Sequence, residues 1–76
     1  MFEELDTVVL AHNIDQYGLK RDDVGTVVHV YKNGEALEVE FVNAEGKTIA
    51  LLTLTPDDIR SIARTEILHV RGFSTA

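Results

Sequence analysis

The sequence predicts an all-β domain in which five short strands curl into a small barrel. Runs of β-branched and aromatic residues are short, and an Asn-Gly pair separates two of them. Neither the polar stretch at 12–23 nor the segment after Thr55 has an apolar stripe long enough for an extended helix. With 76 residues the chain has room for one domain, whose core is near the lower size limit for independent stability.

The first half of the chain is expected to form a strand, a long loop and a hairpin. Strands are predicted at residues 6–12, 24–31 and 36–43, and the residues between the first two form the loop. Asn33-Gly34 predicts a type I′ turn between the second and third strands, because both central residues of that turn need positive φ. Gly25 opens the second strand, where a glycine permits a bend or a close approach of the backbone.

The third strand shows a regular period of two. Leu37, Val39 and Phe41 lie on one face, and Glu38 and Glu40 lie on the other. This alternation predicts one face in the core and one face in water.

The fourth and fifth strands are expected at residues 47–54 and 59–64, after a second turn at Asn43 to Gly46. Thr55-Pro56-Asp57-Asp58 has a cap residue, a proline at the first helical position and acids in the first turn, which predicts a one-turn helix before the last strand. The residues expected to be buried are Val8, Leu10, Val28, Val30, Val39, Phe41, Leu52 and Ile59.

Five short strands, two tight turns, a long early loop and a one-turn helix describe an SH3-like barrel. A five-stranded oligonucleotide-binding barrel is the alternative, but it usually has a longer helix between its third and fourth strands. Here only the turn at Asn43 to Gly46 separates them. The domain organisation predicted is a barrel at residues 1–64 and a C-terminal tail at 65–76 that packs on the barrel or on a partner.

Several motifs in their order along the chain resemble a family of short, mostly bacterial proteins known only as a domain of unknown function. The matching motifs are Leu5-Asp6-Thr7-Val8-Val9-Leu10, Gly18-Leu19-Lys20, Gly25-Thr26-Val27-Val28-His29-Val30-Tyr31, Val39-Glu40-Phe41 and Gly46-Lys47-Thr48. The resemblance covers residues 5–62 and implies an SH3-like fold without an established activity or functional residues. A glycine is frequent in the family where this chain has Asp22, which implies a turn with positive φ there. A broader likeness to KOW domains rests on the basic loop, Gly-x-Val and the hairpin.

The composition describes a folded, acidic domain. Thirteen acidic and seven basic residues give a net charge of −6, which opposes binding to nucleic-acid phosphates. There is no cysteine, so disulfides and thiolate metal sites are excluded, and a cytoplasmic location is expected. The start, Met1-Phe2-Glu3-Glu4, predicts no signal peptide, and no apolar stretch is long enough to span a membrane.

Neither catalysis nor cofactor binding is predicted. His12, His29 and His69 lie on different elements without the spacing of a metal site, so no metal is expected. Glu38 and Glu40 share a face, but nothing around them in the sequence would tune one as an acid. No nucleophile elbow or phosphate-binding loop is present, and no cofactor is expected. The sequence therefore indicates a protein that is not an enzyme.

The fourth strand indicates a binding function, because it is apolar on both faces. Ala50, Leu52 and Leu54 alternate with Ile49 and Leu51, and a small barrel has only one interior. The second face needs a cover, which could be the tail, a second copy in a homodimer or another protein. The residues predicted to bind a partner are Ile49, Leu51, Ile67, Leu68 and Val70.

The function expected is that of a non-catalytic protein-interaction module, such as an antitoxin, immunity or accessory protein. Its acidity suits a protein partner with a basic surface. The alternative is an RNA-binding, KOW-like barrel that uses Lys20, Arg21 and Lys32. Because only seven cations are present, binding to nucleic acid is the less favoured hypothesis.

Overall fold

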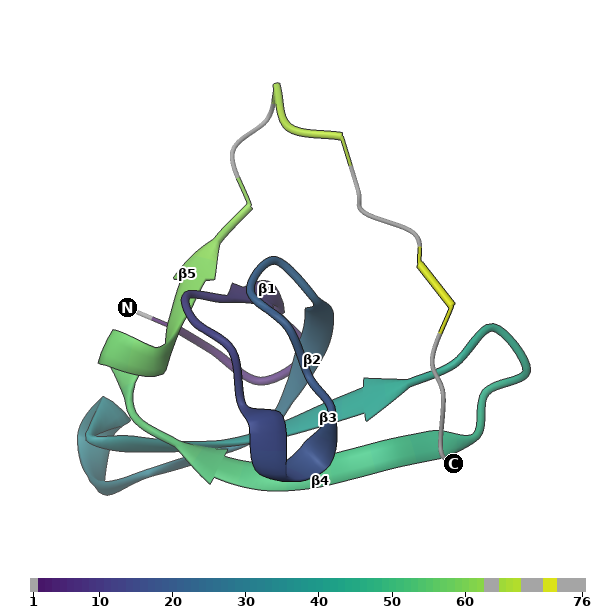
Figure 1. The fold of residues 1–76 in the computed structure, drawn as a ribbon. Coiled ribbons are helices and arrows are strands. Elements are labelled where there is room, and N and C mark those ends of the chain that lie inside the picture. Colours follow the sequence, from purple (N-terminus) through teal and green to yellow (C-terminus); the bar gives the residue numbers. More distant parts are fainter. Residues whose placement is uncertain (1, 63–64, 68–70, 73–76) are drawn as a thin grey trace.

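The fold is all-β, as predicted (Figure 1). A computed structural model of the chain describes residues 2–62, 65–67 and 71–72. Its strands are β1 (Thr7–Leu10), β2 (Val24–Tyr31), β3 (Ala36–Val42), β4 (Thr48–Leu54) and β5 (Ile59–Ser61). Three short 3-10 turns connect them, η1 (Asp15–Tyr17), η2 (Lys32–Gly34) and η3 (Pro56–Asp58). The described residues contain no longer helix.

The five strands form one antiparallel sheet in the order β4-β3-β2-β1-β5. The sheet curls so that β1 and β5 lie across the core from β3 and β4 (Figure 1). Within the part of the chain that the structure describes, no ladder joins the edge strands β4 and β5. The five predicted strands are therefore present as one curled antiparallel sheet, and among the described residues no hydrogen-bonded ladder closes it into a barrel.

The core lies on the concave side of this sheet. Six of the eight residues predicted for it are buried, namely Val8, Leu10, Val39, Phe41, Leu52 and Ile59. Leu19, from the loop before β2, also joins the core, although the polar sequence around it gave no sign of this. An isolated bridge between Ile14 and Leu19 folds the loop back and turns Leu19 inward.

The other two core predictions, Val28 and Val30, are corrected by a β-bulge in β2. Val27 pairs with Val39, but the next paired residue is His29, so Val28 is an extra residue in the ladder. Val27 is fully buried, Val28 is exposed, and Val30 is only partly buried against the core. The bulge also leaves His29 exposed, opposite Glu38 in the ladder.

Positive-φ residues shape the turns. The β2–β3 connection was predicted as a two-residue type I′ turn, but it spans four residues between the Tyr31↔Ala36 pair. Lys32, Asn33 and Gly34 all have positive φ, so the left-handed stretch begins one residue before the Asn-Gly pair. Asp22 has φ of 75°, which confirms the turn that the family resemblance implied.

The strand ends and the last turn follow the predictions with small differences. β1 is shorter than predicted, and β5 is described as a strand as far as Ser61; residues 63–64 of its predicted span lie outside the described residues. The one-turn helix before β5 is confirmed as η3, in which the Asp58 carboxylate accepts hydrogen bonds from the Thr55 N–H and hydroxyl.

Gly25 is required for close packing between β2 and β3. A Cβ at this position would lie 2.8 Å from Phe41 Cε1 and 2.8 Å from Val39 Cγ1. Both neighbours are buried, so neither can move into solvent without a cost. The prediction that Gly25 serves the architecture by a close approach is confirmed.

Candidate protein-interaction surface

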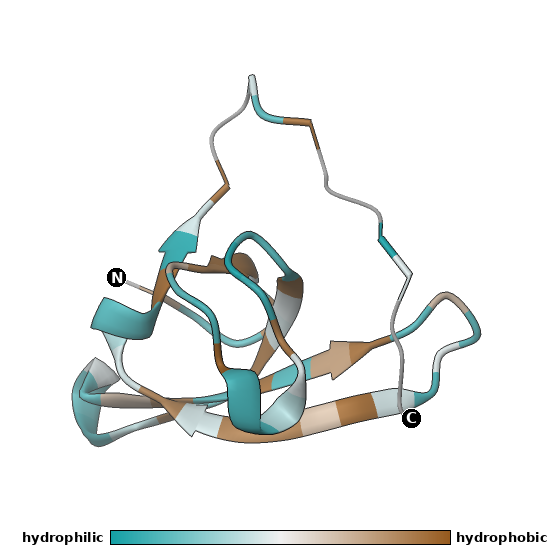
Figure 2. Cartoon of the chain, viewed as in Figure 1, coloured by the Kyte–Doolittle hydropathy of each residue, from teal (hydrophilic) through white to brown (hydrophobic). Residues whose placement is uncertain are grey.

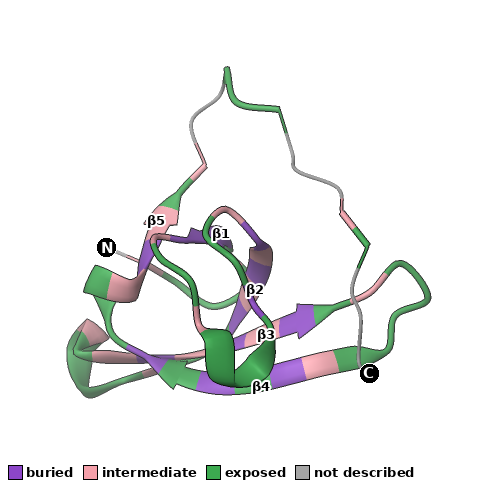
Figure 3. Ribbon diagram, viewed as in Figure 1, coloured by how far each residue is buried: buried purple, intermediate pink, exposed green. Residues whose placement is uncertain are grey.

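The convex side of β2, β3 and β4 carries a mixed patch of apolar and acidic side chains. The register places Thr26, Glu40 and Leu51 in one row across the strands, and His29, Glu38 and Thr53 in the next. Alternate residues of β4 are buried and exposed, as Figure 3 shows. We call the following group the outer patch: Val28, His29, Tyr31, Glu38, Glu40, Val42, Leu51 and Thr53.

Four members of the outer patch are large apolar side chains that are substantially exposed. The exposed fraction is 36% for Val28, 39% for Tyr31, 50% for Val42 and 52% for Leu51. They lie on three neighbouring strands, on both sides of the two glutamates. Exposed apolar side chains bordered by polar groups are a feature of protein-binding sites.

The two glutamates of the outer patch are held in place by threonines of β4. Glu38 accepts a hydrogen bond of 2.7 Å from the Thr53 hydroxyl, and Glu40 accepts one of 2.6 Å from the Thr48 hydroxyl. No lysine or arginine among the described residues forms an ion pair with either carboxylate. The patch therefore presents two ordered negative charges that a cationic partner could neutralise.

Aromatic groups border the acidic row on β2. The rings of His29 and Tyr31 meet edge to face with centroids 4.5 Å apart. His29 lies opposite Glu38 in the ladder, and its Nδ1 is 3.5 Å from Glu4 Oε2. The tyrosine offers a rigid apolar ring with a polar tip, a combination that is enriched at interfaces.

Three of the residues predicted to bind a partner are described by the structure, and these three lie apart within one chain. Leu51 belongs to the outer patch, whereas Ile49 is half-buried and packs against the core next to the register shift in β4. Ile67 is 94% exposed and lies beside Val24, so within one chain it does not cover Leu51. Leu68 and Val70 lie outside the described residues.

Three apolar members of the outer patch were not predicted from the sequence. Val42 has the same strand parity as Glu38 and Glu40, so the alternation in β3 could have revealed it. Val28 could not be found in this way, because the bulge reverses its face. Tyr31 lies at the strand end, where the four-residue turn sets its direction.

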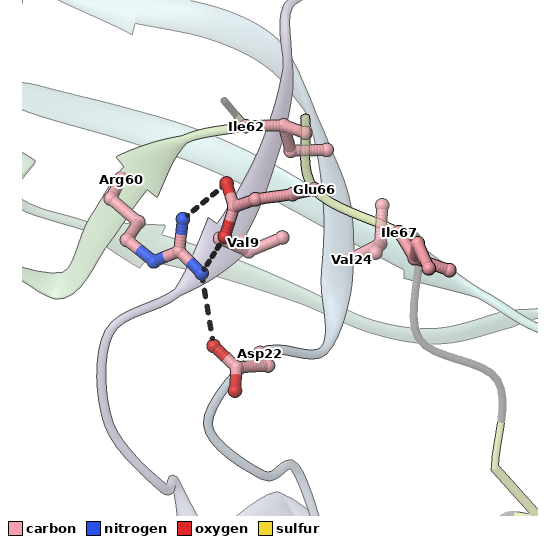
Figure 4. Close-up of a pocket in the computed structure, with 7 residues that line it drawn as sticks. All are labelled: Val9, Asp22, Val24, Arg60, Ile62, Glu66 and Ile67. Carbon is pink, nitrogen blue, oxygen red and sulfur yellow. Dashed lines mark hydrogen bonds and ion pairs between the residues drawn. The ribbon is translucent and has the colours of Figure 1, made fainter. Parts of the chain in front are cut away.

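A small pocket lies next to the start of the tail, between β1, β2 and β5 (Figure 4). Its volume is about 140 Å³, below the range of about 300–1,000 Å³ usual for small-molecule sites. The aliphatic side chains around it are Val9, Val24, Ile62 and Ile67.

An ion-pair cluster closes one side of this pocket. The Arg60 guanidinium points between the carboxylates of Glu66 and Asp22, as Figure 4 shows. Its Nη1 donates to Glu66 Oε1 at 2.8 Å, and its Nη2 lies 2.7 Å from Glu66 Oε2 and 3.2 Å from Asp22 Oδ1. Because these donors already have partners in the chain, Arg60 is suited to holding β5 and the tail together.

A second cluster connects the tail to the loop before β2. Asp23 is 8% exposed, and its Oδ1 accepts a hydrogen bond of 2.7 Å from Arg71 Nε. Arg71 Nη2 also donates to Asp23 Oδ2 and to the carbonyl oxygen of Gly18, at 2.5 and 3.0 Å. The Lys20 N–H donates to Asp23 at 2.8 Å. Asp23 and Arg71 are 48 residues apart, so their contact leaves no periodic signal in the sequence and was not predicted from it.

The three cations proposed for RNA binding do not lie together. Lys20 and Arg21 precede β2, and Lys32 follows it. The eight residues of β2 extend over roughly 26 Å at about 3.3 Å per residue. The loop cations are also next to Asp22 and Asp23. The structure therefore gives no single basic patch made from these residues.

His12 forms a surface pair with Asp58. His12 Nε2 is 2.8 Å from Asp58 Oδ1, and its Nδ1 is 2.9 Å from the Asn13 carbonyl oxygen. The hydrogen bonds to Asp58 and Asn13 raise the pKa of His12. Burial would raise the pKa of Asp58, but hydrogen bonds from His12 and Thr55 outweigh it and lower this pKa. The pair links the long loop to η3.

No group of three metal-ligating side chains occurs among residues 2–62, 65–67 and 71–72. His69, the third histidine of the sequence, lies outside these ranges. His12 and His29 have carboxylate neighbours, Asp58 and Glu4 respectively.

The comparison with known families agrees with the fold and the motifs. Residues 4–61 match the family described as a domain of unknown function (DUF4926). The chain belongs to the DUF4926 family. The match covers every strand from β1 to β5, and Glu66, Ile67 and Arg71 follow it. No curated protein and no solved structure matches this DUF4926 chain. Among its described residues, no helix is long and apolar enough to cross a membrane.

Proposed function

We propose that this protein is a non-catalytic protein-interaction module that binds a partner with a basic surface through the outer patch. Antitoxin, immunity and accessory proteins are modules of this kind. A small domain without cysteine suits the bacterial cytoplasm, where stability cannot depend on disulfides.

The observation that carries the proposal is a pair of hydrogen-bonded carboxylates among exposed apolar side chains, with which no described lysine or arginine forms an ion pair. Glu38 and Glu40 are oriented by Thr53 and Thr48, so a partner cation would meet charges already in place. Preorganised groups lose little side-chain entropy on binding, which favours affinity. Leu51 adds apolar surface in the same row as Glu40.

The net charge of the whole chain also favours a partner with a basic surface. A net charge of −6 attracts a basic protein over a distance of about 8–10 Å at moderate salt and speeds its association. The same charge opposes binding to nucleic acid. The RNA-binding alternative is less well supported because Lys20 and Arg21 lie far along β2 from Lys32.

The test begins with the full-length chain as bait in its native cells, followed by purification of each captured protein. Each captured protein is then titrated against the wild type and the double variant Glu38→Gln/Glu40→Gln. Glutamine keeps the size of the side chain and an oxygen that accepts the threonine hydrogen bond, but it removes the charge. We expect a partner with a basic surface whose affinity falls by about tenfold in the double variant and falls with added salt.

A matched control removes two other carboxylates. Glu35→Gln/Glu45→Gln changes exposed residues in the two hairpin turns and gives the same net charge as the test variant. Its affinity for the partner should stay within about twofold of the wild-type value. Equal losses in both double variants would show that the effect comes from total charge, and equal retention in both would exclude the outer patch as the binding site.

A further inference from the structure

β4 is an edge strand of the sheet formed by the described residues. In the strand order β4-β3-β2-β1-β5, β4 pairs with β3 on one side, and no described residue pairs with its other side. β4 has seven residues, so a row of backbone N–H and C=O groups faces outward along it. Such an edge is a template for another strand.

The β4 edge lacks the features that usually prevent pairing. Thr48–Leu54 contains no charged residue and no proline, although 20 of the 76 residues of the chain are charged. Figure 2 shows β4 without hydrophilic colour, in contrast to the turns on either side. Its register with β3 is regular from Ala50 to Leu54, and the one shift lies at the start of the strand. Long, apolar and uncharged edges are the ones that associate.

We infer that this edge pairs with β4 of a second copy, antiparallel about Leu51, and that the protein forms a two-fold symmetric dimer. Leu51 is the middle residue of β4, so an antiparallel pair centred there places it opposite the same residue of the second copy. Ala50 then lies opposite Leu52 of the second copy, and the two cores continue into each other. A two-fold interface uses the same patch on both subunits.

Charge favours a second copy at this edge. Two chains of net charge −6 repel one another over most of their surfaces, but β4 brings no carboxylate of its own to the ladder. Lys47 precedes β4, and Asp57 and Asp58 follow it after Thr55 and Pro56. Antiparallel pairing therefore brings Lys47 of each copy toward the acids at the end of the other copy's strand, and symmetry provides this contact twice.

In this dimer the exposed side chain of Leu51 would contact the Leu51 side chain of the second copy. Leu51 is 52% exposed in the single chain, and its Cβ would lie about 4.5–5.5 Å from that of the second Leu51. The glutamates on the two β3 strands would stay about 14 Å apart, three strand spacings, which exceeds the screening distance of physiological salt. The dimer thus brings the two Leu51 side chains together on the convex face and leaves Glu38 and Glu40 accessible beside them. It goes beyond the proposed function and does not depend on it.

Cysteine cross-linking tests the register, because the natural chain has no cysteine. Leu51→Cys should form a disulfide-linked dimer under mild oxidation, since facing residues at the centre of the pair lie within disulfide range. Val42→Cys is the matched control. Val42 is 50% exposed on the same face, but it lies on β3. In the dimer the two β4 strands would separate it from Val42 of the second copy, beyond the reach of a disulfide. We expect Leu51→Cys to cross-link at least about tenfold faster, because the control reacts only by random collision.

Sedimentation equilibrium of full-length variants gives an independent measurement. The wild type at about 10 and 100 μM should show a concentration-dependent dimer, and Leu51→Lys should remain monomeric because a lysine at the edge blocks pairing. Val42→Lys, with the same change of charge, should still dimerise. Two results support the proposal. One is faster cross-linking of Leu51→Cys than of Val42→Cys, and the other is a dimer that is lost in Leu51→Lys but kept in Val42→Lys. The proposal is overturned when neither result is obtained. This includes the case in which both lysine variants dimerise equally well.

Discussion

Replacing Gly25 with alanine adds one methyl group at the place where β2 comes closest to the core side chains of β3. The new Cβ would lie 2.8 Å from Phe41 Cε1, 2.8 Å from Val39 Cγ1 and 3.1 Å from Phe41 Cδ1. Normal carbon–carbon contacts are about 3.5–4.0 Å. The ring and the valine must therefore move, although both are enclosed in a close-packed core.

The expected cost follows from two opposing effects. Overpacking a core by a methyl group destabilises by about 1–3 kcal/mol. Gly25 does not have a positive φ, so alanine can adopt its backbone conformation and lowers the entropy of the unfolded chain, a gain of about 0.4–1 kcal/mol. The net loss should be about 1–2 kcal/mol, out of a total of about 4–11 kcal/mol for a chain of this length.

Urea unfolding followed by circular dichroism measures this loss. Gly25→Ala should lower the midpoint by about 1 M with an unchanged slope, because the slope reflects the surface exposed on unfolding. The double variant Gly25→Ala/Phe41→Leu identifies the cause. Phe41→Leu removes the ring atoms nearest the new methyl group, so on that background Gly25→Ala should cost at least about 0.5 kcal/mol less. An unchanged or raised midpoint in Gly25→Ala, or strict additivity of the two changes, would refute the steric explanation.

Three further predictions concern the core, pH and nucleic acid. Phe41→Ala should cost about 3–5 kcal/mol and leave much of the protein unfolded at room temperature by circular dichroism; a cooperative melt near the wild-type temperature would contradict the core assignment. The pKa of His12 is raised and that of Asp58 is lowered, so their pair stabilises the fold at mildly acidic pH. This stabilisation weakens as the pH rises through the folded pKa of His12, and it is lost as the pH falls through the folded pKa of Asp58. His12→Asn should therefore lower the melting temperature more at a pH between those two pKa values than in mild alkali, and an equal effect at both would exclude the pair. In fluorescence anisotropy with a mixed-sequence RNA, the protein should show no binding tighter than about 1 μM at about 150 mM salt, and tighter binding that is lost in Lys20→Glu/Arg21→Glu would favour the RNA-binding alternative.

Much of the fold could be read from the sequence because its signals are local. The alternation in β3 placed Leu37, Val39 and Phe41 in the core, and Thr55-Pro56 located the turn before β5. Such patterns depend on strand periodicity and on the φ preferences of single residues, which act over a few positions. The all-β class and the order of the elements were determined in this way, and the acidic character follows from the composition.

The candidate site was only partly predictable. Leu51 was identified because β4 is apolar on both faces, and it lies in the outer patch. Ile67 was grouped with Leu51 in the sequence, but the structure places it beside Val24, because a sequence pattern does not show which strands lie between two apolar segments. The neighbours of Leu51 are the glutamates of β3, and only the register of the sheet reveals them.

The sequence by itself determined the strands, the alternation of inward and outward faces in β3 and β4, and the positions of the turns along the chain. Only the tertiary structure decided that a bulge buries Val27 in place of Val28, that Arg71 reaches Asp23, and that β4 lies at the edge of the described sheet. The physical reason is that these features depend on pairing between residues far apart in the chain. One extra residue in a ladder reverses every face beyond it, and an ion pair across 48 residues forms only after the fold has brought its partners together.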